Sequence, residues 1–183
     1  MSNILAPVSP PYSKPISERL GQYPKRDGYL LKLFRVFANS PRFLAKGVPN
    51  LLDRDSPLSM RCREIIILRV TGLMRCEYEW GVHITAFADH VGLSEEQRAD
   101  TCEPAINPSL WSETECLLLR IVDQLIRHGG LEDVALQALR ATWTLEQQLE
   151  ICALIGTYHT VSNVANIAAL SPETFSARFP SQI

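Results

Sequence analysis

The 183-residue chain contains no CxxC pair, although five cysteines are spread along it. An odd number of cysteines without paired spacing argues against a disulfide framework. It is typical of a reducing compartment, where thiols serve as small apolar residues. The five are Cys62, Cys76, Cys102, Cys116 and Cys152.

The sequence also lacks a marked charge excess and any long apolar run. Its formal net charge is −2, which gives no electrostatic reason to expect nucleic acid or an anionic membrane as a partner. The sequence contains no run of 18 apolar residues, so no transmembrane helix is predicted. The first residues have neither a basic region nor an apolar core, so no signal peptide is predicted and a cytoplasmic location is expected.

What is present is typical of a globular protein with one core, because 46% of the residues are apolar and 21% are charged. Residues 1–27 hold five of the twelve prolines and are interpreted as an extended arm. Residues 28–183 then form the domain.

Apolar residues recur at helical spacing through almost all of this domain. Three capping boxes, at Ser94, Ser112 and Thr144, mark helix starts, and no β-hairpin signal appears. The sequence therefore predicts an all-α fold. The expected helices span 29–40, a short stretch from Pro41, 59–74, 76–91, 94–103, 112–128, 131–142 and 144–169.

One short stretch, RCEYEWGVH at residues 75–83, concentrates reactive side chains. If the helices over 59–74 and 76–91 form an antiparallel hairpin, Glu64 and His83 lie level with each other, because each residue rises about 1.5 Å. Glu79 is four residues before His83 and shares its helix face, with Cys76 one turn further back. The hairpin thus gathers Glu64, Cys76, Glu79 and His83 into one cluster.

Each member also has an ordinary structural explanation. Glu64 can pair with a neighbouring arginine on a solvated face, Cys76 can fill the core, and His83 can be a half-buried histidine. Two carboxylates and an imidazole can also hold zinc, although a metal-free site is preferred.

The stretch REIIILRVTGLMRCEYEWGVHITAFADHVGLSEEQ (63–97) resembles the core motif of the carboxymuconolactone decarboxylase and alkylhydroperoxidase D superfamily. The likeness is to the branch with a Tyr-Glu-Trp-x-x-His motif, here Tyr78, Glu79, Trp80 and His83. It continues more weakly through 117–133 and 149–166. This resemblance implies an alkylhydroperoxidase D-like helical bundle and a homo-oligomer such as a dimer, trimer or hexamer.

The thiol peroxidases of that superfamily have the pattern E-x11-C-x2-C-x3-H. Its places are held here by Glu64, Cys76, Glu79 and His83, so a carboxylate stands where the second thiol belongs. A peroxidase of this type needs one thiolate to attack the peroxide and another to resolve the sulfenic acid. That cycle cannot run within this motif.

The remaining Glu–Glu–His group suits proton transfer. Of two neighbouring buried carboxylates, one is expected to stay ionised and the other to hold a proton. The predicted function is a cofactor-free lyase or isomerase acting on a small carbonyl or carboxylate molecule. The alternatives are an alkylhydroperoxidase-like thiol peroxidase and a non-catalytic oligomeric binding protein.

Four aromatic or imidazole side chains are further candidates for the substrate pocket. Tyr78 is suited to donate to a developing enolate, and Trp80 to form a wall. Tyr158 and His159, in the last predicted helix, are within reach of the same pocket. For all four, simple packing or a helix surface is the alternative.

Overall fold

A computed structural model describes residues 4–180, and this part of the chain is helical, with no strand beyond one isolated bridge between Arg26 and Tyr29. The all-α prediction is confirmed. In chain order the helices are α1 (Lys14–Leu20), α2 (Lys32–Phe37), α3 (Pro41–Lys46), α4 (Met60–Leu73), α5 (Glu77–His83), the π-helix η1 (Ile84–Ala88), α6 (Glu95–Asp100), the 3₁₀ helix η2 (Pro108–Leu110), α7 (Glu113–His128), α8 (Asp133–Thr142) and α9 (Leu145–Ile167).

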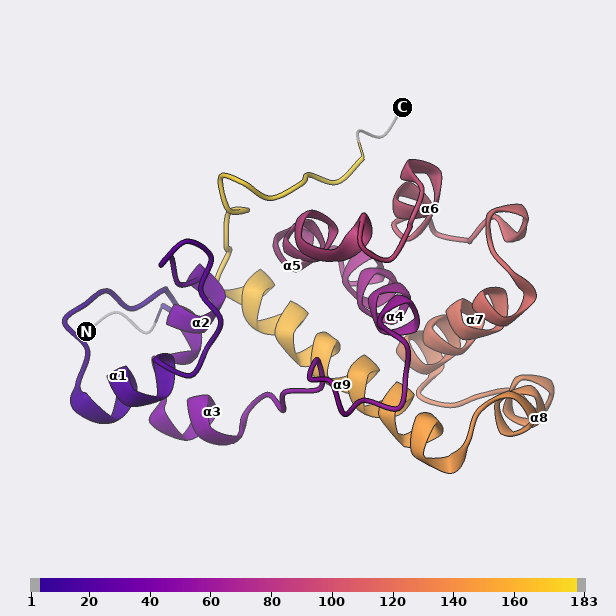
Figure 1. Ribbon diagram of the computed structural model, residues 1–183, viewed down its shortest axis with the longest axis horizontal. Helices are drawn as coiled ribbons and strands as arrows, with labels where there is room; N and C mark the ends of the chain where they lie inside the picture. Colours follow the sequence, from indigo (N-terminus) through magenta and orange to yellow (C-terminus); the bar gives the residue numbers. More distant parts are fainter. Residues whose placement is uncertain (1–3, 181–183) are drawn as a thin grey trace.

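Helix α4 is the centre of the bundle and contacts α5, α7 and α9 (Figure 1). The side chain of Ser59 caps it by accepting from the backbone N–H of Cys62. Residues 65–68 are fully buried. This explains the continuous apolar run, which a helix shows when it is packed on several sides.

The motif helices form the predicted antiparallel hairpin, because the start of α4 meets the end of α5. Arg75 makes the turn in the left-handed region, with φ 52°. The N–H of Cys76 donates to the Thr71 carbonyl at 2.9 Å and closes the end of α4. The helix predicted over 76–91 is shorter in the structure. Helix α5 ends at His83, and the π-helix η1 continues it only to Ala88.

The N-terminal segment differs from the predicted extended arm over 1–27, because part of it is helical. Residues 14–20 form α1, which begins beside Pro15 because proline is tolerated in a first helical turn. Before α1, the chain lies on α2, where the N–H of Val8 donates to the Arg35 carbonyl at 3.1 Å. Helices α1, α2 and α3 group together at one side of the bundle (Figure 1).

Two more predicted helices are shorter in the structure. The expected helix over 29–40 is α2, because the Arg26–Tyr29 bridge holds the preceding residues in a turn. The helix over 94–103 ends as α6 at Asp100. All three predicted capping boxes form, at Ser94, Ser112 and Thr144.

The segment after α9 returns across α5. The N–H of Phe179 donates to Glu77 at 3.0 Å, and that of Ala177 donates to Thr85 Oγ1 at 2.8 Å. The approach is close, since a Cβ added to Gly81 would lie 2.2 Å from the Ala177 carbonyl oxygen. The helix that carries the motif is thus covered by the chain's own C-terminal segment.

No helix within residues 4–180 combines the length and the apolar character that crossing a membrane requires.

Candidate active site

Glu64 and His83 are directly bonded across the helical hairpin. The Nδ1 atom of His83 lies 2.8 Å from Oε2 of Glu64, and both side chains are buried. Their predicted level placement is therefore confirmed. The carboxylate fixes the orientation of the imidazole ring.

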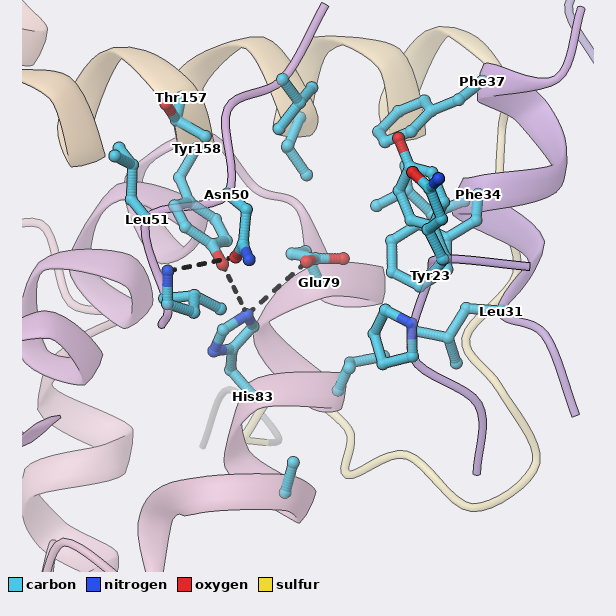
Figure 2. A pocket seen from close by; sticks show the side chains of 18 of the residues that line it. Tyr23, Leu31, Phe34, Phe37, Asn50, Leu51, Glu79, His83, Thr157 and Tyr158 are labelled. Atoms are coloured by element: carbon cyan, nitrogen blue, oxygen red, sulfur yellow. Dashed lines mark hydrogen bonds and ion pairs between the residues drawn. The ribbon is translucent and has the colours of Figure 1, made fainter. Parts of the chain in front are cut away.

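The other ring nitrogen of His83 faces two groups. Its Nε2 atom is 3.1 Å from the Tyr158 hydroxyl and 3.6 Å from Oε1 of Glu79. Figure 2 shows Glu79 and Tyr158 converging on His83 from α5 and α9. Four predicted site residues are therefore joined in one polar cluster: Glu64, Glu79, His83 and Tyr158.

This cluster lies against a cavity of about 840 Å³ that Glu79, His83 and Tyr158 help to line. Most of the other lining is apolar and comes from the N-terminal helices with the loops around them, from the loop before α4, and from α5, η1 and α9. The volume is in the range of pockets that hold small organic ligands. Tyr23 and Phe34, from the N-terminal segment, lie across the cavity from Tyr158 (Figure 2).

The two carboxylates keep His83 charged. Burial alone would lower the pKa of His83, but the charge and hydrogen bond of Glu64, reinforced by Glu79, raise it from 6.5 to about 10. At neutral pH the ring is thus an imidazolium and donates at both nitrogens. The Tyr158 oxygen accepts from Nε2, so its own hydroxyl proton is free to donate into the cavity.

Glu79 and Tyr158 each keep a hydrogen-bonding capacity that no residue within 4–180 uses. Oε2 of Glu79 is buried and has no hydrogen-bond partner within residues 4–180. Burial, with the charges of Glu79 and Glu64, raises the pKa of Tyr158 well above its usual value, so this hydroxyl stays neutral. The site therefore presents one open carboxylate acceptor beside one neutral hydroxyl donor.

Cys76 does not line the cavity. It precedes α5 and is fully buried, and this burial raises the pKa of its thiol to about 11. The reactive species of a cysteine is the thiolate, which is nearly absent here at neutral pH. The geometry supports the interpretation of Cys76 as core packing.

Tyr78 and Trp80 are placed differently from the prediction, because neither side chain faces the cavity. The Tyr78 hydroxyl donates to Glu173 at 2.6 Å and accepts from the Leu33 N–H at 3.2 Å. Trp80 is buried, and its indole N–H donates to Thr101 at 2.9 Å. Both serve packing between segments far apart in the sequence.

His159 is also placed differently, since it lies on the exposed face of α9 while Tyr158 points inward. Among residues 4–180, no group of three His, Cys, Asp or Glu side chains is arranged to hold a metal ion. Both ring nitrogens of His83 have protein partners.

Several residues that line the cavity belong to no recognisable sequence motif, so the sequence did not identify them. Phe87, in the π-helix, packs on the His83 ring with centroids 5.3 Å apart. Asn50, Leu51 and Tyr23 come from the segment interpreted as an arm and from the loop before α4. Short π-helical segments at α-helices are frequent at functional sites, but no residue pattern predicts η1.

Residues 45–123 match the model of the carboxymuconolactone decarboxylase family. The resemblance inferred from the motif is confirmed. No curated protein matches the chain significantly.

Two solved structures share the fold. An uncharacterised peroxidase-related protein from Silicibacter sp. TM1040 has a TM-score of 0.75 and 16% identity, over 95% of this chain and 96% of that one. A protein of unknown function from Agrobacterium tumefaciens, described as a candidate antioxidant defence protein AhpD, has a TM-score of 0.56 and 25% identity, over 64% of this chain and 81% of that one. The predicted alkylhydroperoxidase D-like helical fold is thus confirmed.

Proposed function

We propose that the protein is a cofactor-free lyase or isomerase that moves a proton at a carbon next to a carbonyl group. The observation that carries this proposal is the open Oε2 atom of Glu79 beside the Tyr158 hydroxyl and the His83 imidazolium, at the buried end of a cavity. The match of residues 45–123 to the carboxymuconolactone decarboxylase family model supports decarboxylase-like chemistry.

In this proposal Glu79 is the general base. Its free oxygen takes the proton from the carbon, and the electron pair moves onto the carbonyl oxygen as an enolate. Tyr158 donates a hydrogen bond to that oxygen, and His83 stabilises the negative charge. Glu64 holds the imidazole in place and is a positioning residue.

The enolate then has two outcomes. Return of the proton from Glu79 to a different carbon completes an isomerisation. When the substrate is a β-keto or vinylogous acid, Glu79 takes the proton of its carboxylic acid group, and loss of carbon dioxide then forms the enolate. Glu79 returns that proton to the enolate carbon, which completes a decarboxylation. Both outcomes leave the protein unchanged.

The thiol peroxidase alternative is supported by the names of the two structural neighbours. Against it stand the buried, protonated thiol of Cys76 and the carboxylate of Glu79 at the place of the second thiol. A purely binding protein is disfavoured because Glu64 is 2% exposed and bonded to His83, rather than solvated and distant from it.

Glu79→Gln tests the proposal, because the amide is nearly isosteric but cannot accept a proton. Lactones, β-keto acids and hydroperoxides are screened against the wild type and the variant. Turnover of a carbonyl substrate is expected to fall by about 10²–10⁴ in Glu79→Gln. Glu77→Gln is the control, since within residues 4–180 the Glu77 carboxylate bonds only to Arg178 and Phe179 of the segment after α9. Turnover of hydroperoxides alone, with full activity in Glu79→Gln, would contradict the proposal.

A further inference from the structure

The mouth of the cavity has an unbalanced charge. Three cationic side chains, Arg19, Lys25 and Arg26, line it, and all three are exposed. None of them forms an ion pair with a carboxylate of residues 4–180, unlike Lys32 or Arg61. The acidic side chain of the lining is Glu79, which is buried, whereas the three cations are exposed.

Arg26 is the best positioned of the three cations. Its backbone is fixed by the pair of hydrogen bonds with Tyr29, at 3.0 and 2.8 Å. Its guanidinium lies 4.4 Å from the centroid of the Phe175 ring. Stacking uses the face of the guanidinium and leaves its N–H edges free for a planar anion such as a carboxylate.

Between the cationic mouth and the buried polar cluster the walls are apolar. They include Leu31, Phe34, Phe37, Leu44, Val48 and Leu51. A small and very polar molecule would leave these walls uncovered, whereas an apolar chain or ring system fills a cavity of about 840 Å³ and gains from its burial.

We propose that the substrate is an amphipathic carboxylate. Its carboxylate binds Arg26 at the mouth, with Arg19 and Lys25 adding charge. An apolar segment fills the cavity, and a carbonyl group at the far end reaches Glu79 and Tyr158. The carboxylate at the mouth is thus a recognition group and is distinct from any carboxylate lost in the reaction. This inference rests on the proposed function for the carbonyl end only.

Calorimetry with hexanoate, octanoate and decanoate, each beside the 1-alkanol of equal length, tests the inference. Affinity is expected to rise about three- to fourfold for each added methylene, because each is buried against apolar walls. Each carboxylate is expected to bind about tenfold more tightly than its alkanol, since charge-assisted hydrogen bonds exceed neutral ones.

Arg26→Gln is expected to remove most of this preference while leaving alkanol affinity unchanged, which also reports an intact fold. Arg140→Gln, on the exposed side of α8 and away from the cavity, is the control and should bind like the wild type. Equal binding of carboxylates and alkanols, an unaltered preference in Arg26→Gln, or no binding of any probe would overturn the inference.

These probes have no reactive carbonyl, so their binding does not depend on proton transfer. If they bind as expected and Glu79→Gln keeps full turnover, the anion site stands and the proposed chemistry fails. If they do not bind and Glu79→Gln loses turnover, the chemistry stands and the inferred substrate class fails.

Discussion

Glu64 and His83 are 19 residues apart in the sequence and meet at 2.8 Å between Oε2 and Nδ1. The bond joins the start of α4 to the end of α5, so it locks the motif hairpin at its open end. It also sets the charge of the ring that faces Glu79 and Tyr158.

This bond predicts how stability depends on pH. The pKa of His83 is raised from 6.5 to about 10, so its contribution is fully present below pH 6.5 and is lost as the pH rises toward 10. The free energy of unfolding of the wild type is therefore expected to fall between pH 7 and 8, where unfolded cysteines, with a pKa of about 8.5, are still mostly protonated. Urea denaturation at several pH values measures this.

His83→Gln is the comparison for this experiment. It lacks the titrating ring, so its free energy of unfolding should be lower at pH 7 and nearly constant to pH 8. A wild-type curve that stays flat over this range would show that the imidazolium is not held by the carboxylates.

Variants of two tyrosines distinguish a catalytic role from a packing role. Tyr158→Phe removes the hydroxyl beside His83, and kcat is expected to fall by about 10²–10³. Its cost in stability is expected to be smaller than that of Tyr78→Phe, because Oε1 of Glu79, 3.6 Å from the same nitrogen, can accept in place of the hydroxyl. Tyr78→Phe removes the hydroxyl that joins Glu173 to the Leu33 N–H, and it is expected to cost about 1–3 kcal/mol of stability with kcat nearly unchanged. Steady-state kinetics and chemical denaturation of both variants decide, and the reverse pattern would exchange the two roles.

The sequence predicts those parts of the site that depend on local geometry. Glu64 and His83 could be paired because helical rise and one turn determine their relative heights. Glu79 could be added because a residue four before His83 lies on the same face. The same reasoning could not orient Tyr78, since its partner Glu173 follows 95 residues later.

The cavity could not be predicted in the same way. The N-terminal residues of the wall could not be recognised, because a proline-rich composition indicates an extended chain. In the structure, Pro15 instead lies in the first turn of α1. The inward placement of Tyr158 and the outward placement of His159 depend on how α9 packs on α4. Apolar side chains lie on several faces of α9, so its sequence does not reveal the buried one.

The thiols give a third test. Because Cys76 is buried and the pKa of its thiol is raised to about 11, it is expected to react with a thiol reagent only after denaturation, whereas exposed Cys152 reacts in the folded protein. Intact mass and peptide mapping after peroxide should show no intramolecular disulfide at Cys76. A loss of two protons mapped to Cys76, the mass change of disulfide formation, would instead favour the thiol peroxidase alternative.

We also propose a homo-oligomer that uses the outward face of α9. This face exposes Leu149 to 72% and Ile167 to 74%, and residues 151–167 contain no Asp, Glu, Lys or Arg. The centres of protein interfaces are poor in charge in the same way. Light scattering is expected to show an oligomer that Ala153→Arg dissociates, while Ala141→Arg on α8 leaves it intact. A wild-type monomer at micromolar concentration would contradict the proposal.

The close passage of the C-terminal segment over α5 gives the last prediction. A Cβ at Gly81 would lie 2.2 Å from the carbonyl oxygen of Ala177, and backbone cannot yield as a flexible side chain does. Gly81→Ala is therefore expected to displace this segment and to cost about 1–3 kcal/mol of stability, as overpacking does. Gly130→Ala is the control, since nothing lies within 4 Å of its added Cβ, and it should change stability by less than about 0.5 kcal/mol. Because Phe175 of the same segment lines the cavity, Gly81→Ala should also weaken decanoate binding, and normal stability with normal binding in this variant would disprove the close contact.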